Sequence, residues 1–127
     1  MKLNHECVRE TFLYIENTLP YDQNLLGTDI EEAEELRKFN KDDIKYALSK
    51  LYEAKFIKCE VEYDYYTHKL IYLNIYDITW DGHKFLDTIR DPKVWRETKK
   101  EAKKLPDISL TMLGDIGFKV ATKMMGL

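Results

Sequence analysis

His83 and Asp87 are two side chains whose types and spacing suit a general base and the carboxylate that orients it. Residues four apart share a helix face, so Asp87 could hold the imidazole of His83 in place. No motif in the sequence places a nucleophile beside them. His83 also lies between Trp80 and Phe85, as a structural histidine often does. We therefore predict no catalytic residues and no enzyme.

Metal and cofactor chemistry is not predicted either. The candidate ligands are His5, Cys7, Cys59, His68 and His83, and their spacing matches no zinc-binding pattern. The two cysteines lie far apart in sequence and are interpreted as reduced thiols of the core. The sequence predicts no metal site and no cofactor.

Basic residues gather between Arg90 and Lys104 in a pattern typical of phosphate contact. They are spaced mostly by three or four, so they can share a helix face and follow a DNA backbone. Those predicted to bind nucleic acid here are Lys93, Arg96, Lys99, Lys100 and Lys103. A second set, on an earlier helix, would enter a DNA groove: Asn40, Lys41, Lys45 and Ser49. Double-stranded DNA is therefore a candidate partner.

Charge elsewhere in the chain argues against DNA. The net formal charge is −3, whereas duplex-binding domains usually carry a basic excess. The segment Asp29–Glu35 holds acids and no base, and Glu60, Glu62 and Asp64 would face outward from an expected hairpin. A solvated, charged helix would also explain the basic segment. A role in protein interaction therefore stays open beside DNA binding.

The first half of the chain predicts helices followed by a hairpin. Apolar residues at helical spacing predict helices over 4–18 and 42–54, the second capped by Asn40. Alternation predicts strands over 58–66 and 70–76, with Ile71, Leu73 and Ile75 toward the core and Thr67–Lys69 as the connection. Residues 21–28 are interpreted as a loop, and residues 29–39 as an ambiguous segment with the composition of a short helix.

Helices follow in the second half. One begins at the capping residue Thr79 with Trp80 in the core, a basic helix restarts at Asp91-Pro92, and an amphipathic helix covers 108–125. The predicted fold class is α+β, a winged helix-turn-helix over residues 1–90 with a β-hairpin wing and a C-terminal helical extension over 91–127. A missing hairpin or a solvent-exposed Trp80 would contradict the winged helix.

The final helix predicts an interface. Its main apolar stripe includes Leu113, Ile116, Val120 and Met124, and other apolar residues such as Phe118 lie off that stripe. An apolar surface this wide indicates a second subunit or a protein partner. We expect a homodimer with the four stripe residues at its interface. A helix wrapped only by its own chain is the alternative.

Three runs of residues carry a family resemblance. Tyr46–Ile57 has the pattern Tyr-Ala-Leu-x-x-Leu-x-x-Ala-Lys-Phe-Ile, Ile78–Asp87 has Ile-Thr-Trp-x-Gly-His-x-Phe-Leu-Asp, and Ile89-Arg90-Asp91 precedes Val94-Trp95. These runs resemble a family of uncharacterised bacterial and phage proteins, a domain of unknown function. The family has His where this chain has Ala47, and Gly where it has Lys55. The resemblance implies a winged-helix-like fold and a mobile-element setting, and it implies no activity.

Length and composition agree with an ordinary globular chain. It has 127 residues, of which 44% are hydrophobic and 34% charged. No apolar run is long enough for a membrane span, and the start lacks the apolar core of a signal peptide, so we expect a cytoplasmic protein without membrane contact. The predicted function is a winged-helix DNA-binding protein, a transcriptional regulator of phage or mobile-element type. The alternative is a winged-helix protein–protein interaction module without DNA binding.

Overall fold

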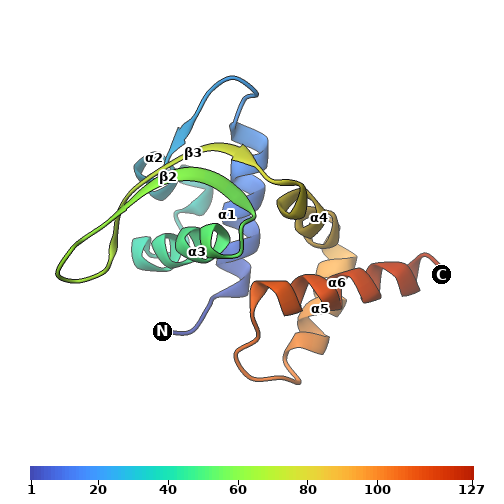
Figure 1. The fold of residues 1–127 in the computed structure, drawn as a ribbon. Coiled ribbons are helices and arrows are strands. Elements are labelled where there is room, and N and C mark those ends of the chain that lie inside the picture. Colours follow the sequence, from blue (N-terminus) through green and yellow to red (C-terminus); the bar gives the residue numbers. More distant parts are fainter.

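The chain forms six α-helices, one short 3₁₀ helix and a three-stranded antiparallel sheet (Figure 1), described by a computed structural model that covers residues 1–127. The fold class is therefore α+β, as predicted. The elements are α1 His5–Thr18, β1 Leu25–Leu26, α2 Gly27–Glu31, η1 Glu34–Leu36, α3 Lys41–Glu53, β2 Ile57–Tyr63, β3 Leu70–Ile78, α4 Trp80–Ile89, α5 Pro92–Ala102 and α6 Leu110–Met124.

Capping side chains set where α1 and α3 begin. The Asn4 side chain accepts a hydrogen bond from the Cys7 amide (3.1 Å), and the Asn40 side chain accepts one from the Asp43 amide (2.8 Å). Both helices bury one apolar face, which in α3 consists of Ile44, Ala47, Leu48 and Leu51. The two predicted helices and the Asn40 cap are confirmed.

The predicted hairpin is also confirmed. Strands β2 and β3 pair antiparallel, and the sheet order is β1-β3-β2. The connecting turn is closed by a hydrogen bond of 2.7 Å from the Asp64 amide to the Lys69 carbonyl. Leu73 and Ile75 are buried as expected, but Ile71 is 61% exposed, so its predicted place in the core is wrong. The hairpin continues beyond the helices that cover the rest of the sheet (Figure 1).

For two segments between α1 and α3, the structure corrects or completes the prediction. Residues 21–28 contain β1, which pairs Leu25 with Ile75 and Leu26 with Asn74, so the interpretation as a plain loop is wrong there. A strand of two residues gives no alternation that a sequence pattern could detect. The ambiguous segment 29–39 contains the end of α2 and η1, which bury Ile30 and Leu36.

Trp80 does not lie in the core. Its side chain is 79% exposed, so the expectation that it anchors the fold is wrong, and this is one of the two observations expected to contradict the winged helix. The inward contact near the start of α4 is made instead by Gly82, where an added Cβ would lie 2.1 Å from the Phe56 carbonyl oxygen. Backbone packs against backbone there, which leaves no space for an indole.

Three aromatic rings fill the centre of the molecule. Phe12, Phe56 and Phe85 stack on one another, with centroids 4.9 Å apart for Phe56 and Phe85. They bring α1, the α3–β2 turn and α4 into one core, which continues into α5 and α6 through Trp95 and Leu113. None of the helices is both long and apolar enough to span a bilayer.

Candidate functional site

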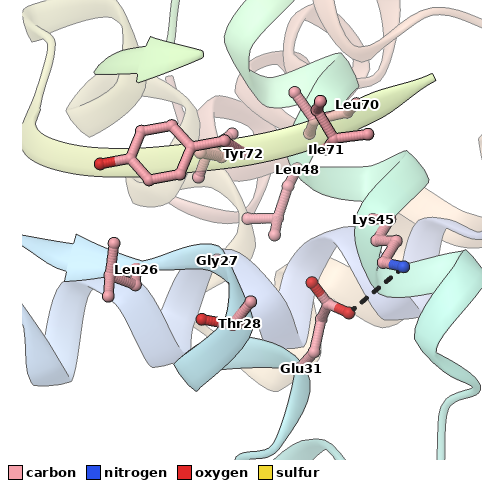
Figure 2. Close-up of a pocket in the computed structure, with 10 residues that line it drawn as sticks. Leu26, Gly27, Thr28, Glu31, Lys45, Leu48, Leu70, Ile71 and Tyr72 are labelled. Atoms are coloured by element: carbon pink, nitrogen blue, oxygen red, sulfur yellow. Dashed lines mark ion pairs between the residues drawn. The ribbon is translucent and has the colours of Figure 1, made fainter. Parts of the chain in front are cut away.

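A pocket of about 300 Å³ lies between α3, β3 and the start of α2 (Figure 2). Most of its lining is apolar and comes from Leu26, Leu48, Leu70, Ile71 and Leu73. Gly27, Thr28 and Tyr72 also line it. The charged residues in it are Lys45 and Glu31, which pair with each other across 3.7 Å. Strand β1 ends at Leu26, opposite Asn74, so β3 from Leu70 to Leu73 has no neighbouring strand on this side.

The groove-contact residues predicted on α3 are mostly engaged within the chain. Lys41 pairs with Glu32, whose hydrogen bond raises the pKa of the lysine, and Lys45 pairs with Glu31. Ser49 is buried and donates to the Tyr46 carbonyl (2.8 Å). The Asn40 side-chain oxygen is used as the helix cap. Two acids of the Asp29–Glu35 segment, Glu31 and Glu32, thus lie against lysines of α3.

The basic residues of α5 fall into two groups. Lys99 pairs with Glu6 of α1, and Lys100 pairs with Glu97 across 3.3 Å. Lys93, Arg96 and Lys103 are exposed and take part in no ion pair. Helix α3 and the hairpin lie on one side of α1, whereas α5 lies on the other (Figure 1). The two predicted nucleic-acid sets therefore do not form one continuous surface.

Trp95 anchors α5 to α1. Its indole nitrogen donates to Glu6 (2.9 Å), and the cationic groups of Arg9 and Lys99 each lie 5.7 Å from the centroid of its ring. Arg9 in turn donates to the Ile89 carbonyl at the end of α4 (2.6 Å). Hydrogen bonds from Lys99 and Trp95 outweigh the effect of burial on Glu6 and hold the pKa of its carboxyl below the ordinary value.

His83 and Asp87 are not a pair. Asp87 binds Arg90, which also holds Glu16 of α1, whereas His83 is exposed and makes no side-chain hydrogen bond. Both cysteines are free thiols, and burial raises the pKa of Cys59 to about 11. No group of three or more His, Cys, Asp or Glu side chains is arranged to hold a metal ion.

Comparison with known families finds one described as "Hypothetical protein (DUF2513)", which matches residues 2–108. The chain belongs to this family. The match covers all the elements from α1 to α5 and ends at Ile108, before α6 begins at Leu110. Comparisons with curated proteins and with solved structures give no match. Family membership therefore assigns a domain of unknown function.

Helix α6, outside the family match, carries the predicted interface residues. Leu113 is fully buried against the chain's own core, so it cannot contact a partner in this arrangement. Ile116, Val120 and Met124 line a groove of about 810 Å³ between α5 and α6. Phe118, Met125 and Leu127 are exposed as well. No sequence signal indicated the α3–β3 pocket, because it depends on where β1 ends, and β1 was not predicted.

Proposed function

We propose that the DUF2513 chain is a winged-helix protein-interaction module whose α3–β3 pocket holds a segment of a partner protein. The winged-helix assignment is supported by the element order α1-β1-α2-α3-β2-β3 and by the β1-β3-β2 sheet with its long hairpin. The exposed Trp80 counts against this assignment, which rests on the element order and the sheet alone. The observation that carries the functional proposal is the apolar pocket, beside which the lysines of α3 are already paired with acids.

Charge around this face favours a protein over DNA. Glu31 and Glu32 neutralise Lys45 and Lys41, and Asp42 adds exposed negative charge at the start of α3. A phosphate backbone would be repelled by this distribution, because non-specific DNA affinity depends on a local excess of positive charge. An apolar peptide side chain entering the pocket meets no such cost.

The free edge of β3 favours an extended partner segment. Gly27 lies against the Leu73 carbonyl, but the backbone of Leu70–Tyr72 has no strand beside it, and a peptide can hydrogen-bond along such an edge. Successive side chains of an added strand point to opposite faces. One apolar side chain of the segment would then enter the pocket beside Ile71 and Leu48.

Peptide selection tests this proposal. Selection from a random peptide library on the wild-type chain should yield apolar peptides. These peptides should bind the Ile71→Asp variant at least 10-fold more weakly than the wild type, because binding would bury an unpaired charge. Tyr21→Asp is the matched control because Tyr21 is fully exposed and lies outside the pocket. Selected peptides that bind Ile71→Asp as tightly as wild type would refute the pocket as their site.

DNA binding is the second candidate, favoured by one observation. Lys93 and Arg96 on α5, and Lys103 directly after it, are exposed and unpaired, as phosphate contacts require. Fluorescence anisotropy of a labelled random duplex, at low and at physiological salt, separates the two functions. We expect no binding at physiological salt. Affinity that falls steeply with salt and disappears in Lys93→Glu/Arg96→Glu/Lys103→Glu would instead support a DNA-binding regulator of phage or mobile-element type.

We also propose that the chain forms a homodimer through α6. The support is the exposed apolar surface of this helix, where Phe118, Met124 and Met125 are at least half exposed. Sedimentation velocity over a range of protein concentrations measures the association directly.

A further inference from the structure

The groove between α5 and α6 has two walls of opposite charge. Its floor is apolar and consists of Leu105, Ile116, Val120 and Met124. Glu97 and Glu101 of α5 form one wall together with Lys104, which follows α5, and Lys119 and Lys123 of α6 line the other. An apolar floor between an acidic and a basic edge is a surface that needs a partner with the reverse order of charges.

The charges on these walls are available to a partner. Lys119 and Lys123 are exposed and take part in no ion pair within the chain. Glu97 pairs only with Lys100 of its own helix, across 3.3 Å, and Glu101 only with Lys104 just after that helix, across 3.1 Å. Exposed pairs three residues apart on a helix are weak, so a partner's lysine can compete for these acids.

We propose that this groove is the contact surface of a symmetric homodimer, in which the acids of each α5 face the lysines of the other chain's α6. The inference rests on the homodimer proposed above and adds the surface and its symmetry. A two-fold axis brings one patch against its own copy. If the axis runs along the groove, each acidic wall meets a basic wall. If it runs across the groove, acid meets acid, so the charges select the first arrangement.

A second copy of the chain fits this groove better than an unrelated helix. Any occupant must present an acidic edge to Lys119 and Lys123 and a basic edge to Glu97 and Glu101, on either side of an apolar centre. The chain itself carries that pattern on the same surface. The floor residues Val120 and Met124 would then contact their own copies near the axis.

Reversing the charge of one wall at a time tests the inference in the full-length chain. Lys119→Glu/Lys123→Glu makes both walls acidic, and Glu97→Lys/Glu101→Lys makes both walls basic. Each variant alone should be monomeric, with a dimer dissociation constant raised on the order of 100-fold, because like charges would face each other. An equimolar mixture of the two should form a heterodimer with an affinity within about 10-fold of the wild-type dimer, since each acidic wall then meets a basic one.

Matched controls carry the same change in net charge elsewhere. Lys58→Glu/Lys69→Glu and Glu60→Lys/Glu62→Lys alter exposed hairpin residues and should leave the dimer unchanged. Circular dichroism verifies that each variant is folded. A wild-type chain that stays monomeric at all concentrations would overturn the homodimer itself. A dimer that persists in both wall variants, or folded variants whose mixture stays monomeric, would overturn the groove arrangement and leave a wild-type dimer standing.

Discussion

The hydroxyl of Thr79 donates a hydrogen bond of 2.7 Å to the main-chain carbonyl of Lys55, and so ties the start of α4 to the end of α3. The same oxygen accepts the Gly82 amide at 2.9 Å, and the Thr79 amide donates to the Phe56 carbonyl at 3.0 Å. The Thr-Trp-x-Gly run, on which part of the family resemblance depended, is therefore a structural joint. Its threonine and glycine are the residues that make the joint.

This joint predicts unequal effects within the run. Gly82→Ala should lower the free energy of unfolding by about 3 kcal/mol, because its Cβ would lie 2.1 Å from the Phe56 carbonyl oxygen and the backbone would have to move. Trp80→Ala should change it by less than about 0.5 kcal/mol, since the indole is exposed. Urea unfolding measures both. A larger loss for Trp80→Ala than for Gly82→Ala would contradict this account of the joint.

Lys55 occupies a backbone conformation that favours glycine. Its φ is +64°, and the hydrogen bonds from Phe56 to Leu51 and from Lys55 to Tyr52 close α3 in a Schellman motif. Lys55→Gly should therefore raise the free energy of unfolding by about 1 kcal/mol. Lys58→Gly, an exposed change within β2, is the control and should destabilise. Equal effects of both changes on thermal unfolding would rule out the backbone explanation.

Glu6 should make stability depend on pH. Its pKa lies below the ordinary value of 4.5, so its ion pair stabilises the fold fully above that pH and is lost as the pH falls through the lowered pKa. Glu6→Gln should cost less than about 1 kcal/mol at pH 7, because the pair is partly exposed, and the difference from wild type should shrink below pH 4. Denaturant unfolding across this pH range measures it. A difference that stays constant down to pH 3 would exclude the charge of Glu6 as the cause.

The two thiols should be slow to react. A pKa of about 11 leaves Cys59 with on the order of a hundredth of the thiolate of an ordinary thiol at pH 8. Burial also raises the pKa of Cys7. Labelling with a thiol reagent should be at least 10-fold slower in the folded chain than in urea, and Cys59→Ser isolates the rate of Cys7. Rapid labelling of the folded wild-type chain would show that Cys59 is more accessible than the structure indicates.

Local signals predicted most of the elements because their physical causes are local. Asn40 and Thr79 cap their helices whatever fold the rest of the chain adopts. Alternating apolar and polar residues predict a strand whichever strand it pairs with. Trp80 was wrongly predicted to lie in the core, because an aromatic residue near the start of a helix can lie on its buried side or on its exposed side. Only the approach of Phe56 to Gly82, distant in sequence, decides which side is open.

The candidate sites were less predictable, since they depend on pairs of residues from separate elements. The lysines of α3 look available for DNA until Glu31 and Glu32 are found beside them. Leu113 and Ile116 belong to one helical stripe, yet the first lies in the core and the second lines a groove. A helical stripe shows which residues share a face, but not which neighbouring element covers each part of it.

The close crossing of α6 over α4 has a kinetic consequence. A Cβ at Gly117 would lie 2.8 Å from the Cβ of Thr88, so the backbone of α6 packs closely against α4 at this point. This contact fixes α6, which lines one side of the α5–α6 groove, within a single chain. Two chains that meet through this groove should associate in one bimolecular step whose rate constant falls with ionic strength, without a slow rearrangement afterwards.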